Sequence, residues 1–172
     1  MKKIILISLL VLSIYLFNTT NEKEEIVIPD TAIRFRILAN SNTVYDQNIK
    51  LKEKERLEKE LFNILSTAKT TKESEILIKT NINKIDKIVK EELAQENYSY
   101  NIDYGMNYFP EKEYKGVKYK EGEYKSLLVT LGKGEGDNFW CVLFPPLCMM
   151  ETEEKTEVEY KFLIKDTLEK YF

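Results

Sequence analysis

Apolar residues recur along this chain with two different periods, and the longer period predicts three helices. In residues 44–65 and 70–93 they fall three and four positions apart, which is typical of helices that bury one face. A Thr-x-x-Glu capping box opens the second segment at Thr70 and recurs at Thr156, so a third helix is expected from there to the C-terminus. The apolar stripes are Leu57, Leu61, Ile64 and Leu65; Ile78, Ile82, Ile85, Val89 and Leu93; and Val158, Phe162, Leu163 and Leu168.

A period of two predicts strands in other parts of the chain. In residues 33–37 the apolar side chains would face inward, and Arg34 and Arg36 would face outward. Residues 126–131 form a further apolar strand. A third strand alternates with an aromatic face made of Tyr98, Tyr100, Ile102, Tyr104 and Met106.

The densest apolar run after the N-terminus, residues 139–144, predicts a buried strand. Both of its faces are apolar, so either both are covered, as in a core strand, which we favour, or one meets a partner. The faces carry Trp140, Val142 and Phe144, and Phe139, Cys141 and Leu143. Pro145 and Pro146 lack amide donors and end the strand. The Gly-x-Gly-x-Gly loop at residues 132–136 lies between two predicted strands, which favours a hairpin loop over a phosphate-binding loop.

Two long helices combined with several strands predict an α+β fold. We expect a mainly antiparallel sheet with two long helices packed on one face, plus a C-terminal helix. The expected organisation is a secretion signal or N-terminal anchor in residues 1–20, a linker in 21–31, a single α+β domain in 32–150 and a C-terminal helical extension in 151–172.

The N-terminus has the pattern of a secretory signal, with Lys2 and Lys3 followed by an apolar run at residues 4–17. As a helix this run would be ~21 Å long, short of the roughly 30 Å hydrocarbon core of a bilayer. No Ala-x-Ala follows it, so cleavage and an uncleaved anchor in contact with the membrane both stay open. The rest of the chain is expected outside the cytoplasm.

Composition excludes several classes of protein. The chain contains no histidine, which excludes Ser-His-Asp and Cys-His catalysis, and its two cysteines are too few for a four-thiolate zinc site. From the sequence we expect no pair of carboxylates in an apolar context that would raise the pKa of one of them. The net charge of −3 is opposite in sign to that of typical nucleic-acid-binding domains. We therefore expect no enzymatic activity, no cofactor, no metal and no nucleic-acid partner.

Two blocks of sequence resemble the stage II sporulation protein R family of endospore-forming Firmicutes. The first is IRFRILANS at residues 33–41, followed by Asp46, and the second is FWCVLFPPLC at residues 139–148. The resemblance implies a signalling protein that is made in the forespore and exported into the space between the two membranes around it. There it would trigger a membrane-embedded aspartic protease of the mother cell to process a sigma-factor precursor.

Nine residues are candidates for contact with that partner. Arg34 and Arg36 form either a solvated face or a stripe that recognises carboxylates. Helix capping also explains the polar candidates at the start of the first helix. The full set is Arg34, Arg36, Asn40, Ser41, Asp46, Trp140, Phe144, Pro145 and Pro146.

Two alternatives stay open at this point. Cys141 and Cys148 form either a disulfide, which an exported setting permits, or two buried free thiols. The alternative function is an exported small-molecule or peptidoglycan-binding module, for which the tyrosines of residues 98–106 would supply the surface.

Overall fold

The computed structural model describes residue 13 and residues 26–96, 99–150 and 155–172. Apart from Ser13, the predicted leader lies outside these ranges. Among the residues described, no helix combines the length and apolar character needed to cross a membrane.

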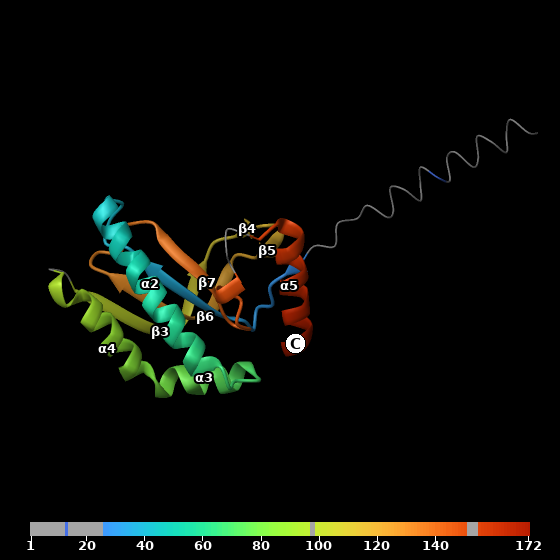
Figure 1. The fold of residues 1–172 in the computed structure, drawn as a ribbon, viewed down its shortest axis with the longest axis horizontal. Coiled ribbons are helices and arrows are strands. Elements are labelled where there is room, and N and C mark those ends of the chain that lie inside the picture. The colour runs from blue at the N-terminus through green and yellow to red at the C-terminus, as the bar shows by residue number, and fades with distance from the viewer. Residues whose placement is uncertain (1–12, 14–25, 97–98, 151–154) are drawn as a thin grey trace, which may run out of the picture.

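A four-stranded mixed sheet forms the centre of the molecule, in the order β3-β6-β2-β7 (Figure 1). Its strands are β2 (Ile33–Leu38), β3 (Tyr100–Phe109), β6 (Gly122–Leu131) and β7 (Asn138–Phe144). β2 is parallel to β6 and antiparallel to β7, and β3 is antiparallel to β6. Because β2 lies between β6 and β7, the prediction of a hairpin at residues 132–136 is wrong. That loop crosses the end of β2, where Gly136 N donates to Ala39 O at 2.9 Å.

A smaller sheet has the order β1-β5-β4. Its strands are β1 (Ile26–Val27), β4 (Lys112–Tyr114) and β5 (Val117–Tyr119). β1 lies in the segment predicted as a linker, and the next residue, Ile28, is fully buried and donates its N–H to Lys118 O at 3.1 Å. Residues 26–31 therefore belong to the folded body rather than to a linker.

Three helices follow β2: α2 (Val44–Leu65), α3 (Thr71–Thr80) and α4 (Ile82–Glu92), the last continued by the 3-10 turn η1 (Leu93–Gln95). Thr43 is the N-cap of α2 and accepts a hydrogen bond from Asp46 N. The single helix predicted for residues 70–93 is interrupted at Asn81, whose side-chain amide donates to Leu77 O at 2.9 Å. A side chain that bonds the local backbone in this way competes with the helical ladder. The apolar stripe is nevertheless continuous across the break.

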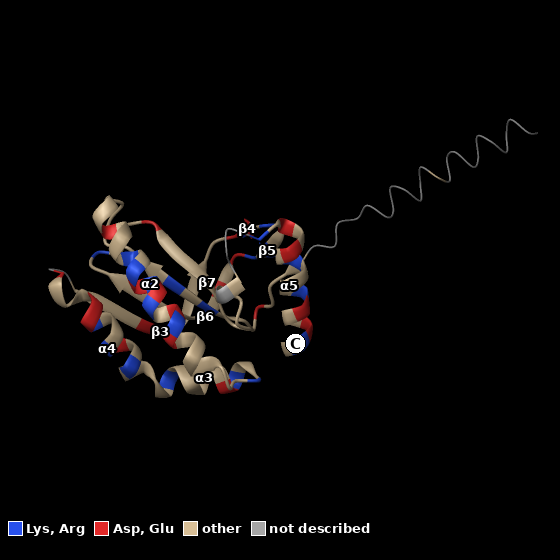
Figure 2. Ribbon diagram, viewed as in Figure 1, with Lys and Arg blue, Asp and Glu red and all other residues tan. Residues whose placement is uncertain are grey.

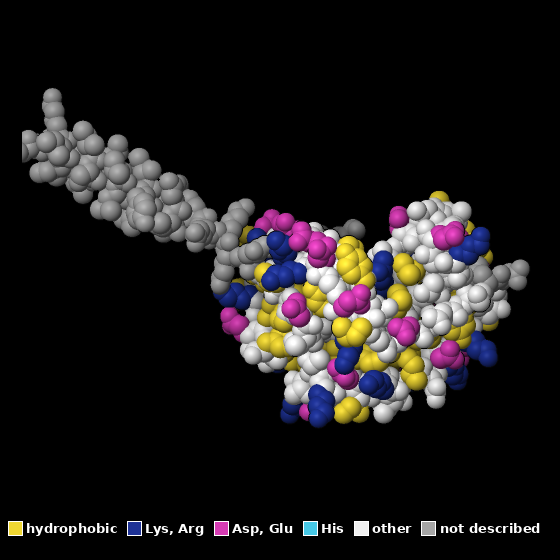
Figure 3. Space-filling view, turned by 180° about the vertical axis from the view of Figure 1, so that it is seen from behind, with side chains coloured by type: hydrophobic (Ala, Val, Ile, Leu, Met, Phe, Trp, Pro, Cys, Tyr) yellow, Lys and Arg dark blue, Asp and Glu magenta, His cyan; other side chains and the backbone are white. Residues whose placement is uncertain are grey.

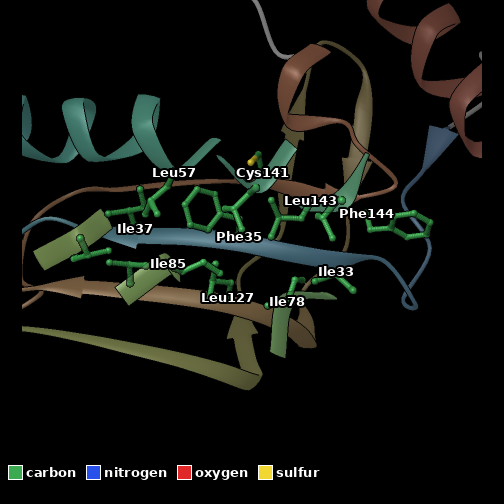
Figure 4. Close-up of a cluster of buried hydrophobic side chains, with 14 of the residues drawn as sticks. Ile33, Phe35, Ile37, Leu57, Ile78, Ile85, Leu127, Cys141, Leu143 and Phe144 are labelled. Carbon is green, nitrogen blue, oxygen red and sulfur yellow. The ribbon is translucent and has the colours of Figure 1, made fainter. Parts of the chain in front are cut away.

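The main core lies between these helices and one face of the large sheet (Figure 4). Ile33, Phe35 and Ile37 of β2 are fully buried there, as the alternation predicts. Leu57 of α2, Ile78 of α3 and Ile85 of α4 meet them from the helix side. The predicted amphipathic faces of the long helices are thereby confirmed.

A second core covers the opposite side of β2, β6 and β7 and includes the small sheet and α5 (Glu157–Tyr171). The helix at the C-terminus is confirmed, but the predicted apolar stripe is wrong: Val158 and Phe162 are 77% and 72% exposed, whereas Tyr160 and Ile164 are fully buried. The α+β class is confirmed. Helices cover both sides of the large sheet rather than one.

Candidate partner-binding surface

The end of β7 forms a compact corner held by a disulfide. Cys141 and Cys148 are bonded, with their Cα atoms 5.2 Å apart, so the structure contains the disulfide rather than two free thiols. Between them the chain passes through the cis Phe144–Pro145 peptide and Pro146. Leu147 N then donates to Val142 O at 3.2 Å, which turns the segment back along its own strand. Pro145 is buried and Pro146 is half-buried.

The pairing of β7 with β2 is irregular at this corner. Ile33 faces Phe144, whereas the next residue, Arg34, faces Val142. The shift turns Phe144 away from Trp140 and Val142 and into the main core, so the predicted shared face of these three residues is wrong. Both faces of β7 are covered, as the sequence predicts.

A mostly apolar pocket of about 190 Å³ lies beside the disulfide, between the C-terminal half of α2, the corner and the end of α5. Phe62 is 47% exposed at this pocket. Tyr171 packs edge-on against Phe144, with ring centroids 5.0 Å apart. The lining consists of Glu58, Leu61, Phe62, Leu65, Ser66, Leu143, Phe144, Pro146, Cys148 and Tyr171. A pocket of this size accepts a bulky apolar side chain.

Glu58 supplies the carboxylate of this pocket. Burial raises its pKa, and Lys54, with Nζ 3.5 Å from the carboxylate, opposes the shift. The Glu58 carboxylate and the sulfurs of Cys141 and Cys148 lie within 4.8 Å of one another. Because the two sulfurs are bonded to each other, they are not thiolates and do not fit the role of metal ligands.

The predicted exposure of Arg34 is wrong, because its side chain is fully buried in the second core. Its guanidinium carbon lies 3.4 Å from the centroid of the Tyr124 ring, 5.0 Å from that of Phe109 and 5.2 Å from that of Trp140. Nη2 donates to Lys120 O at 3.3 Å, while Nε and Nη1 have no partner in the described part of the chain. Burial lowers the pKa of Arg34. Period-two patterning missed this because α5 and the small sheet cover that face.

Arg36 is half-buried and lies on the same sheet face as Arg34. Its Nη1 donates to Tyr108 O at 3.3 Å, and burial lowers its pKa. The two arginines therefore do not form one accessible stripe, and only Arg36 retains contact with solvent.

The polar candidates near the start of α2 form a structural network. Asp46 is buried and accepts hydrogen bonds from Asn40 Nδ2 at 2.9 Å and Ser41 Oγ at 2.5 Å. Asn40 Oδ1 also accepts from Lys133 N at 3.0 Å, and a Cβ on Gly132 would lie 2.1 Å from that oxygen. These bonds tie α2 to the loop that crosses β2. Asn40 and Ser41 do not cap the helix themselves, because Thr43 is its N-cap.

The nine predicted residues thus lie in three places: the second core, the α2 start and the corner. The corner alone combines several of them with a pocket. Sequence patterning missed Glu58, Phe62 and Tyr171, which line that pocket. The sequence did contain an indication for Phe62: it is an aromatic residue that lies beside the apolar stripe of its helix, not within it, which is typical of an exposed contact residue.

The charged side chains on the surface do not form a candidate binding site stronger than this pocket in Figures 2 and 3. Figure 2 shows Lys and Arg interspersed with Asp and Glu along the helices. Figure 3 shows apolar side chains scattered among charged ones on the opposite side of the molecule. Neither view indicates recognition through one large field of a single sign.

Comparison with known proteins shows which family the sequence matches. The family model described as stage II sporulation protein R matches residues 29–154. A stage II sporulation protein R from Bacillus subtilis (strain 168) is 40% identical over 133 residues, which cover 76% of this chain and 59% of the relative. The chain thus spans about three fifths of that relative's length. No solved structure matches.

Proposed function

Since the chain belongs to the stage II sporulation protein R family, and therefore has a role in sporulation, we propose that it is an exported signal between the two cell compartments. In this proposal it leaves the forespore and activates a membrane-embedded aspartic protease of the mother cell. The protease then processes a sigma-factor precursor. The chain acts as a protein ligand and carries out no chemistry itself.

The pocket beside the Cys141–Cys148 disulfide carries this proposal. It is concave and apolar, and an exposed aromatic side chain, Phe62, stands at it. Protein interfaces are anchored by aromatic residues that enter or line such pockets. The corner also contains the Pro145–Pro146 segment of the more distinctive sequence block, and it lies within the family match.

Co-expression in a host that does not sporulate tests the proposal. The chain, the protease and the sigma-factor precursor are produced together, and precursor processing is followed by the change in precursor mass. We expect processing only when all three are present. Processing that is independent of this chain, or absent with all three present, contradicts the proposal.

Matched variants assign the activity to the pocket. Phe62→Asp places a carboxylate at the pocket and should reduce processing at least tenfold, about 1.4 kcal/mol or more of binding free energy. Phe162→Asp makes the same change at a 72% exposed position of α5 and should process normally. Equal activity of the two variants would remove the pocket from the proposed interface.

The peptidoglycan-binding alternative gains no support from β3. Tyr100 and Tyr104 are half-buried against the main core, and the Tyr100 hydroxyl donates to Asp86 at 2.9 Å. They therefore do not line an open stripe.

A further inference from the structure

The two edges of the large sheet differ in how they are protected. At β7, the folded-back corner supplies Leu147 N to the Val142 carbonyl, and two prolines end the strand. β3 is the opposite edge, and no described strand pairs with its outer side. It runs for ten residues with an unbroken register against β6. Long regular edges of this kind are open to pairing with another strand, and proteins usually interrupt them.

β3 carries few of the residues that block edge pairing. It contains no proline, lysine or arginine, and Asp103 is its only charged residue. Met106 and Tyr108 are 59% and 55% exposed along it.

We propose that the β3 edge pairs antiparallel with the β3 edge of a second copy of this chain, about a two-fold axis at Tyr104. This register places Tyr100 opposite Tyr108 and Ile102 opposite Met106 on one face. On the other face Asn101 meets Asn107 and Asp103 meets Gly105. The two sheets become one continuous eight-stranded sheet, and the interface is isologous.

Charge selects this register over its neighbour. An axis at Asp103 would place the two Asp103 carboxylates opposite each other, which is unfavourable. An axis at Tyr104 instead lies near side chains of both positive and negative charge on the helix-covered face of the sheet. Lys79 Nζ lies 5.9 Å from the centroid of the Tyr104 ring, and burial, reinforced by the nearby charge of Glu75, raises the pKa of Tyr104. Each copy therefore has charges of both signs near the axis, namely Lys79 and the Glu75–Lys125 ion pair.

The inference concerns assembly and does not depend on the proposed function. One added strand on each side makes a small interface, so we expect a reversible dimer with a dissociation constant in the micromolar range. Sedimentation velocity of the exported protein over a range of concentrations tests it. A monomer at all concentrations up to hundreds of micromolar would overturn the proposal.

Matched lysine variants locate the interface. Met106→Lys introduces a cation opposite Ile102 of the second copy and should weaken dimerisation about tenfold. Phe162→Lys makes a comparable change on α5 and should leave dimerisation unchanged. A dimer that persists in Met106→Lys, or is lost in Phe162→Lys, assigns the interface elsewhere and rejects β3.

Single-cysteine variants test the axis. The described part of the chain has no free cysteine, so one added thiol is the only one available to a short bismaleimide. Tyr104→Cys should crosslink to itself across the axis, whereas Met106→Cys lies opposite Ile102 and should not. Crosslinking of Met106→Cys without Tyr104→Cys contradicts the register, and circular dichroism of both variants verifies that they fold.

Discussion

Arg34 and Arg36 are two residues apart on β2, yet they differ in their contact with solvent. Arg34 is fully buried among aromatic rings, and its Nε and Nη1 nitrogens have no hydrogen-bond partner among the described residues, whereas Arg36 is half-buried. A charge-reversal test of both together would therefore unfold the protein instead of reporting on partner binding. Each residue needs its own substitution.

We expect Arg34→Glu to lower the free energy of unfolding by about 3–5 kcal/mol, because it buries an uncompensated carboxylate against the negative faces of the rings. Arg34→Met replaces the cation with an apolar side chain and should change it by less than about 1.5 kcal/mol. Urea denaturation measures both. A loss above 3 kcal/mol in Arg34→Met would show that stacking on Tyr124 outweighs burial of the charge.

Glu53 makes the stability of the protein depend on pH. Its carboxyl group is fully buried on α2 without a hydrogen-bond partner in the described ranges, and burial, reinforced by the charge of Glu92 and opposed by Arg56, raises its pKa to about 7. Because the folded-state pKa lies above the unfolded value, the folded protein retains a proton that the unfolded chain has lost. The free energy of unfolding should therefore fall as pH rises from about 4.5 to 7, and then level off.

Glu53→Gln removes this proton linkage. The difference in unfolding free energy between wild type and Glu53→Gln should change by on the order of 3 kcal/mol across that window, with the wild type losing stability. Urea denaturation at a series of pH values measures it. A difference that is constant with pH would show that Glu53 is ionised in the folded protein.

Among the elements, the corner at the end of β7 depends on its disulfide. Seven positions separate Cys141 from Cys148, and closing so short a loop stabilises the folded state by about 2–3 kcal/mol in the chain-entropy model. We expect the double variant Cys141→Ala, Cys148→Ala to have a free energy of unfolding lower by that amount, as measured by urea denaturation. Alkylation with and without reductant, followed by mass measurement, shows whether native material contains the bond. Two reactive thiols in native protein would contradict it.

Helix α5 lies outside the family match but contributes to the second core. The Tyr160 hydroxyl is 2.8 Å from that of Tyr119, and Ile164 is fully buried. Ile164→Ala should cost about 2–4 kcal/mol through the cavity it leaves, whereas Phe162→Ala should stay within about ±0.5 kcal/mol. Thermal denaturation of the two variants compares them directly. Equal losses of stability in the two variants would contradict the packing of α5 through Ile164.

At the scale of the whole molecule, the proposed export depends on residues 1–20, which precede the folded body. The short apolar run and the absence of Ala-x-Ala lead us to expect export with slow or incomplete cleavage. Intact-mass analysis of exported protein should find chains that begin between Asn18 and Asn21, together with uncut chains. Recovery of the protein only from the cytoplasm would contradict export.

The sequence by itself determined the local elements of this protein. The spacing of Ile33, Phe35 and Ile37 predicted a strand, the stripe from Ile78 to Val89 predicted a helical face, and Thr156 with Glu159 predicted the start of α5. The apolar run of β7 required cover on both faces, and both are covered. These inferences succeeded because period and capping depend on residues within one or two turns of each other.

Only the tertiary structure decided which elements are neighbours. β2 separates β6 from β7, so loop composition alone did not distinguish a crossover from a hairpin. The aromatic rings of the second core cover Arg34, although an alternating strand gives the same pattern whether its second face meets water or protein. The pocket gathers Phe62, Phe144 and Tyr171 from three elements. Such sites depend on contacts between distant segments, which no local period records.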